Sequence, residues 1–254
     1  MVTDILTRVA KRAVRPWWEF SLRRHLDPDS ELLRFGTAHG GWTLPAWAAR
    51  SGGVAICVGA GEDISFDVEL NKIGFSVFTL DPTPRAREHV TAVLNAADGG
   101  PVPFINQSTT ELYDLQEFDK NRFAFVEVGL WKENTTMRFF GPKNPAHVSH
   151  SIVNLQRTNE WFEARCETLA TFCNSHQIEN IDILKLDVEG SEYAILGNIL
   201  ENGPLPRVLC VEFEEIRNPL DGNLMERILK IMDALGKAGY KFRHIENSNV
   251  LFVR

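Results

Sequence analysis

Two hydrophobic periods alternate along the chain and predict strands and helices in turn. Residues 54–58 form a short apolar run that ends at a glycine, and apolar side chains at helical spacing follow over residues 64–73. Residues 75–81 form a second β-branched run, and two prolines then introduce a helical stretch over residues 85–97. Two successive strand–helix units indicate a parallel sheet.

The second half of the chain continues the pattern. Strand-like segments at 122–131 and 135–140 flank a short polar stretch, so we expect a strand pair there. The polar residues 141–160 that follow are a candidate wall for a substrate site. Further expected elements are strands at 181–190, 207–215, 240–246 and 250–254, and helices at 192–200 and 223–238. A series of this kind that closes in an antiparallel hairpin predicts an α/β, doubly wound, Rossmann-like fold.

The composition indicates one fairly large soluble domain. The chain has 254 residues, of which 44% are hydrophobic, and 27 Lys and Arg stand against 34 Asp and Glu, a formal net charge of -7. That balance argues against nucleic acid as a partner. Cys57, Cys166, Cys173 and Cys210 show no CxxC spacing and are expected to be reduced thiols. The sequence shows neither a signal peptide nor an apolar stretch long enough to span a membrane, and we therefore predict a cytoplasmic protein.

The N-terminal region departs from this average. Residues 1–26 interleave six arginines and lysines with tryptophans and aliphatic residues. A basic amphipathic helix of this kind lies on an anionic membrane surface or a protein partner, or else packs over the rest of the domain. We therefore divide the chain into a helical extension, residues 1–50, and a main domain, residues 51–254. The oligomeric state is left open.

The turn after the first strand carries the first chemical signal. Gly59 and Gly61 match the first two glycines of a dinucleotide-binding turn, but Ile64 stands where the third is expected. Glu62 and Asp63 would set two carboxylates beside a pyrophosphate, which like charges oppose. The turn is therefore better suited to a ligand with a cationic end and no phosphate, such as S-adenosylmethionine.

The end of the second strand supports a nucleoside ligand. Asp81 follows Gly59 by 22 positions, close to the interval at which an acid meets ribose hydroxyls in nucleotide-binding units. Each feature also has a simpler reading, since Asp63 and Asp81 can both cap the helices that follow them. Taken in order along the chain, the features favour a cofactor site.

Three blocks resemble the FkbM-type family of S-adenosylmethionine-dependent methyltransferases, a class I group with many O-methylating members. They are GAGEDISFD at 59–67, FTLDPTP at 78–84 and IDILKLDVEGSEYAIL at 181–196, and the last is the most specific. The resemblance extends from about Gly53 to about Glu215. The first turn is one residue shorter than the commoner GAN-x-GD form of the family.

The resemblance implies a fold and a set of cofactor contacts. The fold would be the class I methyltransferase fold, a seven-stranded and mostly parallel sheet whose last strand, near residues 250–253, is antiparallel. Gly59, Gly61 and Asp63 would line the methionine side, and Asp81 would hold the ribose. The expected cofactor-binding residues are Gly59, Ala60, Gly61, Glu62, Asp63, Asp81 and Pro82.

The expected reaction is methyl transfer to a hydroxyl of a small molecule, with a sugar or glycan-like acceptor favoured. The hydroxyl proton must be removed, and His147, His150 and Asp187 are the candidate bases. Aromatic residues available to stack on a sugar ring are Trp131, Phe139, Phe140 and Trp161, although such residues also serve as core.

A divalent cation is the second route to an activated hydroxyl. Asp187 and Glu212 end two strands that should be neighbours, and their oxygens suit Mg²⁺ better than zinc. In the simpler reading, Glu189 and Glu192 cap the short helix and Asp187 serves the cofactor. Lys185, inside an apolar strand, is expected to reach a neighbouring carboxylate or the edge of the sheet.

Two other functions stay open at this point. One is an NAD-dependent oxidoreductase, which the acidic turn disfavours. The other is a non-catalytic module that keeps the fold and binds a partner or a membrane through residues 1–26.

Overall fold

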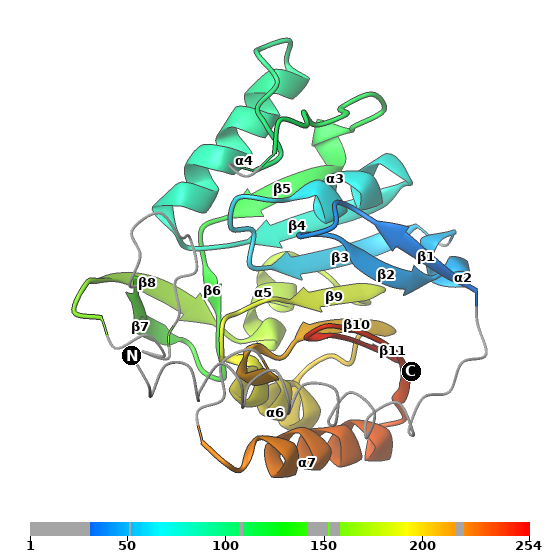
Figure 1. The fold of residues 1–254 in the computed structure, drawn as a ribbon, viewed down its shortest axis with the longest axis vertical. Coiled ribbons are helices and arrows are strands. Elements are labelled where there is room, and N and C mark those ends of the chain that lie inside the picture. Colours follow the sequence, from blue (N-terminus) through cyan, green and yellow to red (C-terminus); the bar gives the residue numbers. More distant parts are fainter. Residues whose placement is uncertain (1–30, 51, 107–108, 142–151, 153–157, 217–220) are drawn as a thin grey trace, which may run out of the picture.

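A computed structural model describes residues 31–50, 52–106, 109–141, 152, 158–216 and 221–254. Within these ranges, seven strands form one central sheet with helices on both faces (Figure 1). The strands are β3 (Gly53–Val58), β4 (Phe75–Leu80), β5 (Phe123–Val126), β9 (Ile183–Leu186), β10 (Val208–Glu212), β11 (Lys241–Glu246) and β12 (Asn249–Val253). The helices are α3 (Ser65–Lys72), α4 (Pro84–Ala97), α5 (Leu169–Ser175), α6 (Glu192–Asn202) and α7 (Leu224–Lys237), with 3₁₀ turns η1 (Lys120–Arg122) and η2 (Glu214–Ile216).

The order of the sheet is β11-β12-β10-β9-β3-β4-β5. β12 is antiparallel to both β10 and β11, whereas β3, β4, β5, β9 and β10 are paired in parallel. The chain moves outward from β3 to β5 and then returns to the other side of β3 at β9. This is the doubly wound order with one antiparallel C-terminal strand, as the sequence predicted. Its point of reversal, between β3 and β9, is where such sheets bind ligands.

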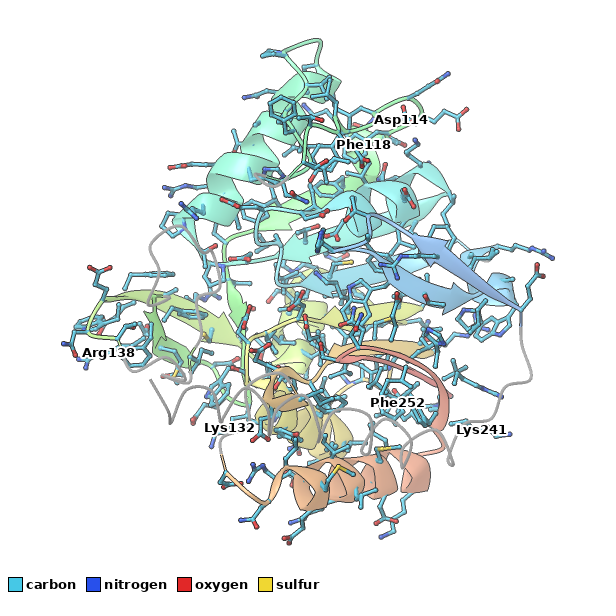
Figure 2. All side chains as sticks on the ribbon, viewed as in Figure 1. Asp114, Phe118, Lys132, Arg138, Lys241 and Phe252 are labelled. Atoms are coloured by element: carbon cyan, nitrogen blue, oxygen red, sulfur yellow. The ribbon has the colours of Figure 1, made fainter. Side chains whose placement is uncertain are left out.

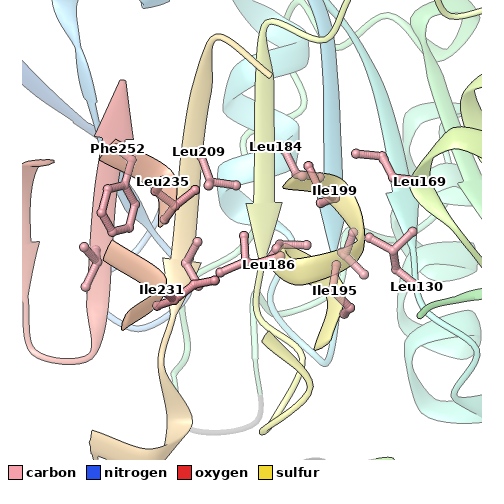
Figure 3. Packing of buried hydrophobic residues seen from close by; sticks show 14 of the residues in the cluster. Leu130, Leu169, Leu184, Leu186, Ile195, Ile199, Leu209, Ile231, Leu235 and Phe252 are labelled. Carbon is pink, nitrogen blue, oxygen red and sulfur yellow. The ribbon is translucent and has the colours of Figure 1, made fainter. Parts of the chain in front are cut away.

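Both faces of the sheet are buried because alternate residues of each strand enter different cores. In β3, Ile56 and Val58 join the cluster that contains α5, α6 and α7, whereas Ala55 and Cys57 join the cluster under α3 and α4. Figure 3 shows the first cluster, in which strand leucines such as Leu186 meet Ile195 on α6 and Ile231 on α7. The continuous apolar runs of the sequence therefore reflect burial on both sides.

A second, smaller sheet corrects one prediction. The segments 122–131 and 135–140 do not pair with each other. The first contributes β5 to the central sheet and then β6 (Gly129–Leu130), which pairs with β8 (Trp161–Glu167). The second forms β7 (Thr135–Phe140), whose six residues all pair antiparallel with β8. The expected pairing was wrong because β8, which the sequence did not single out as a strand, lies between its two members and offers the longer ladder. Figure 2 shows Arg138 of β7 at the outer end of this sheet.

The helical extension expected over residues 1–50 is also corrected where the structure describes it. Residues 31–50 form a β-hairpin, β1 (Leu32–Phe35) and β2 (Trp42–Pro45), followed by the single-turn helix α2 (Ala46–Ala49). Trp42 and Leu44 are buried in the α3-side core of the main domain. The hairpin is thus part of that domain, because its inward side chains complete the core. The basic segment 1–26 lies outside the described residues.

The cysteines agree with the expectation of reduced thiols, since all four are buried and free. Cys57 and Cys210 lie on β3 and β10, the strands on either side of β9. In the part of the chain that the structure describes, none of the helices is both long enough and apolar enough to cross a bilayer.

The hairpin gives a direct test of its place in the core. Leu44 is 0% exposed, so Leu44→Ala should lower the free energy of unfolding by about 2–5 kcal/mol through lost burial and the cavity that remains. Leu33, on the same hairpin but 37% exposed, is the matched control, and Leu33→Ala should cost under ~1 kcal/mol. Urea titration of both variants measures the difference. Equal, small effects in the two variants would show that residues 31–50 are not part of the core of the main domain.

Candidate functional site

A cavity of about 480 Å³ opens at the carboxyl ends of the central strands. Its walls come from the ends of β3, β4, β9 and β10 and from the small sheet, and this volume suits a nucleoside-sized ligand. Predicted cofactor residues among its lining are Gly59, Ala60, Gly61, Glu62, Asp63, Asp81 and Pro82, and predicted catalytic or metal residues are Asp187 and Glu212. The fold thus brings together in one cavity residues that lie up to about 150 positions apart in the sequence, as expected for parallel strands that end at one edge.

The glycine turn forms the floor of the cavity. Gly59 directly follows β3, has a φ of 88° and donates its N–H to the Leu80 carbonyl at 2.9 Å. A Cβ atom at Gly59 would lie 1.8 Å from the backbone oxygen of Asp187. Gly61 also has a positive φ, 54°, but a Cβ there would meet nothing within 4 Å. Position 59 therefore requires glycine both because a side chain would collide with the end of β9 and because its φ is positive, whereas position 61 favours glycine only because its φ is positive.

Asp81 holds this turn in place. One carboxylate oxygen accepts the N–H groups of Ala60 at 2.9 Å and Gly61 at 3.0 Å, and the other accepts that of Thr83 at 2.8 Å. The N-cap of α4 is the Thr83 side chain, which accepts from the Ala86 N–H. Asp81 is only 6% exposed, and its carboxylate has further lone pairs that can accept ribose hydroxyls.

The two acids that follow the glycines differ in their partners. Glu62 lies 3.4 Å from the Arg85 guanidinium. Asp63 accepts the Ser65 N–H at 3.0 Å, at the start of α3, as in the capping reading of this residue. It also accepts the Thr37 hydroxyl at 2.7 Å and the Asn106 amide at 3.2 Å. These donors are neutral, so they satisfy the Asp63 oxygens without cancelling the negative charge.

Thr37 and Asn106 were not predicted from the sequence. Thr37 lies in the connection between β1 and β2, within the glycine-rich stretch GTAHGG at 36–41, and that stretch is the signal that could have identified it. Asn106 lies in the irregular segment between α4 and β5, where neither spacing nor composition marks it. Both contacts depend on segments that approach Asp63 only in the folded chain.

A tight turn after β9 carries the most specific sequence block. Glu189 and Gly190 have φ values of 50° and 102°, and the Gly190 N–H donates to the Glu192 side chain at 2.8 Å. Glu192 is 0% exposed, and burial, with backbone hydrogen bonds opposing and the charge of Glu214 adding to it, raises its pKa to about 8. Glu192 thus caps the turn, largely as a neutral acid at neutral pH.

The predicted metal ligands lie in the cavity wall but form no recognisable metal site. Glu212, which is 8% exposed, accepts the hydroxyl of the buried Ser248 at 2.7 Å. Among the residues that the structure describes, no group of three or more His, Cys, Asp or Glu side chains could hold a metal ion. The expectation of Mg²⁺ at Asp187 and Glu212 therefore finds no support. His147 and His150, the predicted bases, lie outside the described residues, as does most of the loop 141–160.

Lys185 reaches the site from the central strand β9. Its ammonium donates to the Gly59 carbonyl at 2.5 Å and lies 3.8 Å from a carboxylate oxygen of Asp187. The expectation that it reaches a neighbouring carboxylate is confirmed.

Comparison with known proteins identifies the family. The model of the methyltransferase FkbM domain matches residues 53–242 of the 254. The chain belongs to the FkbM methyltransferase family. Membership implies S-adenosylmethionine as the methyl donor. The matched range contains every residue of the site described in this section except Thr37 and Ser248.

The other comparisons add less to the FkbM assignment. A search of curated proteins finds no match. A solved structure with a related arrangement is the fibrillarin pre-rRNA processing protein of Methanococcus jannaschii, with 14% identity, coverage of 89% of this chain and 81% of that chain, and a TM-score of 0.38. At that TM-score we draw nothing from the likeness.

The two glycines of this FkbM methyltransferase give a matched pair of variants. Gly59→Ala forces a collision with the Asp187 backbone and should cost about 3 kcal/mol or more of unfolding free energy. Gly61→Ala meets no atom and should cost only ~1 kcal/mol, for its positive φ. Denaturant titrations compare them. A Gly59→Ala protein as stable as Gly61→Ala would show that β3 and β9 do not approach as described.

Glu192 predicts a specific pH dependence of stability. The pKa of Glu192 is about 8 in the folded protein and near 4.5 in the unfolded chain. Its contribution to the free energy of unfolding is therefore complete below pH ~4.5 and is lost as the pH rises towards 8. Glu192→Gln cannot ionise. The decrease in melting temperature from pH 5.5 to 8.5 should therefore be smaller in this variant than in wild type, by about 5 °C or more. Parallel pH profiles for the two proteins would exclude a buried, neutral Glu192.

Proposed function

We propose that this chain is an S-adenosylmethionine-dependent O-methyltransferase that methylates a hydroxyl of an uncharged small molecule, with a sugar or glycan-like acceptor favoured. The observation that carries the proposal is the charge distribution of the cavity. At the β3–β4 side, neutral donors hold Asp63 and Asp81 beside a glycine turn. At the β9–β10 side, Asp187, Glu189 and Glu212 line the wall.

The cofactor fits the first side of this cavity. The Gly59 turn allows close backbone approach, and Asp63 offers negative charge to the cationic groups of the cofactor. The remaining lone pairs of Asp81 suit ribose hydroxyls, and Pro82 and Leu130 give an apolar boundary for a base. A pyrophosphate would meet the same acids with like charge, which disfavours NAD and with it the oxidoreductase alternative.

The acceptor would lie over the ends of β9 and β10. When bound, S-adenosylmethionine supplies an electrophilic methyl group for in-line displacement, and the protein must align the attacking hydroxyl. We assign the acceptance of the hydroxyl proton to Asp187, which lines the cavity and whose side chain is 31% exposed. His147 and His150 stay predicted alternatives for that role. The other carboxylates can accept sugar hydroxyls, but they oppose acceptors that carry phosphate or carboxylate groups.

Phe139 is the aromatic residue with a place in this arrangement. It lines the cavity, is 7% exposed and stacks on Phe162 of β8. Trp161, by contrast, is 47% exposed and lies under the Arg138 guanidinium at 4.2 Å. The sugar-stacking role predicted for several aromatic residues is therefore proposed for Phe139 alone. The adaptor alternative depends on residues 1–26 and gains no support from the described part of the chain.

The function is tested in two steps on one preparation. Calorimetric titration should give micromolar affinity for S-adenosylmethionine and no measurable binding of NAD. Labelled methyl groups should then pass to neutral saccharides but not to their phosphorylated or uronic acid counterparts, with and without Mg²⁺. Asp187→Asn should reduce transfer about a hundredfold while cofactor affinity stays within threefold of wild type.

Three results would oppose the proposal. Methyl transfer confined to amines would exclude O-methylation. Preference for the phosphorylated saccharides would contradict the charge argument. Loss of transfer on chelation of Mg²⁺ would restore the metal-assisted route.

A further inference from the structure

Lys185 is a buried cation in the middle of the sheet, and the strand register makes room for it. It pairs in register with Cys57 on β3 and with Cys210 on β10, so all three residues share the α3 face. Lys185 is 2% exposed and both cysteines are 0% exposed. Two small neighbours leave room on this face for the long lysine side chain, which reaches the cavity.

The ammonium joins two parts of the cavity wall. It donates to the carbonyl of Gly59, in the turn after β3, and lies 3.8 Å from the carboxylate of Asp187, at the end of β9. Both residues line the cavity, as does Lys185 itself. One buried group therefore contacts the turn that would receive the cofactor and the carboxylate that would face the acceptor.

The charge state of Lys185 excludes it as a base. Burial alone would lower the pKa of its ammonium, but the nearby carboxylates of Asp187 and Asp67 act in the opposite direction and the net result is a raised pKa. Lys185 is thus cationic throughout the neutral range and can act only as a donor and as a fixed positive charge.

We propose that Lys185 is a positioning residue for methyl transfer. Its ammonium fixes the Gly59 carbonyl, and hence the cofactor turn, relative to the Asp187 carboxylate, so that donor and acceptor are presented at a constant separation. It acts through Gly59 and Asp187. The inference rests on the proposed function, because it takes the Gly59 turn as the place where the cofactor binds.

A purely structural role makes a different prediction. If Lys185 merely filled the core, a residue of similar length would replace it without effect on ligand binding. Removal of one member of a buried ion pair destabilises the fold because it leaves the partner's charge uncompensated, and this holds for any variant that lacks the ammonium. If Lys185 positions the turn, two uncharged variants of similar stability should therefore still differ in cofactor affinity, according to whether they keep a donor for the Gly59 carbonyl.

The experiment compares Lys185→Met, which removes donor and charge, with Lys185→Gln, which keeps a donor for the Gly59 carbonyl. Lys237→Met is the control, since Lys237 is 76% exposed and pairs with Asp233 on α7, away from the cavity. The probe is S-adenosylhomocysteine in calorimetric titrations, with thermal unfolding of every protein. Lys185→Met and Lys185→Gln should have similarly lowered melting temperatures, because both lack the ammonium. Lys185→Met should bind the probe about tenfold more weakly than wild type, Lys185→Gln should lie between the two in affinity, and Lys237→Met should match wild type.

Each outcome bears on the proposal. Wild-type affinity in Lys185→Met overturns the inference and leaves the proposed function intact. Equal losses of affinity in Lys185→Met and Lys185→Gln, at equally lowered stability, also overturn it, because that pattern marks a structural role. If Lys185→Met does not fold, Lys185→Gln decides by the same criterion. Absence of binding to wild type, for S-adenosylmethionine as well, rejects the proposed function and this inference with it.

Discussion

The close approach of β3 and β9 at their carboxyl ends is the constraint on which the site depends. The backbone of Asp187 lies where any side chain at Gly59 would be, so the two strand ends pack without an intervening group. This contact sets the floor of the cavity and brings the turn proposed to receive the cofactor beside the carboxylate proposed to face the acceptor. The Lys185 ammonium spans the same junction from inside the sheet. A methyl transfer site needs such rigidity because its rate depends on the alignment of two reacting groups.

Neutral donors satisfy the oxygens of three acids in the cavity. Backbone N–H groups serve Asp81, a hydroxyl and an amide serve Asp63, and the Ser248 hydroxyl serves Glu212. Neutral donors fix each carboxylate in direction but leave the negative charge of the cavity in place. A cationic ligand can then supply the opposite charge. Glu62 differs, because Arg85 lies close enough to offset its charge.

Distant segments supply several of these donors. Thr37 comes from the β1–β2 hairpin, and Ser248 comes from the turn between β11 and β12, at the opposite end of the chain. The Ser248 carbonyl also accepts the Phe213 N–H at 3.0 Å, which ties the C-terminal hairpin to the end of β10. The antiparallel strand β12 therefore has a role at the site, because its pairing with β10 brings the preceding residue, Ser248, beside Glu212.

The sequence by itself determined the doubly wound sheet, its antiparallel last strand and the residues that line its carboxyl edge. These follow from local information, because hydrophobic period and turn residues act over a few positions and parallel strands bring their ends to one edge. Tertiary structure decided the rest. β8 lies between β6 and β7. The core of the main domain includes Trp42 and Leu44, which the sequence had assigned to an extension. The donors to the cavity acids include Thr37, Asn106 and Ser248. Such pairings join residues far apart in the chain, and they are selected by the total burial and hydrogen bonding of the folded molecule, which no local pattern records.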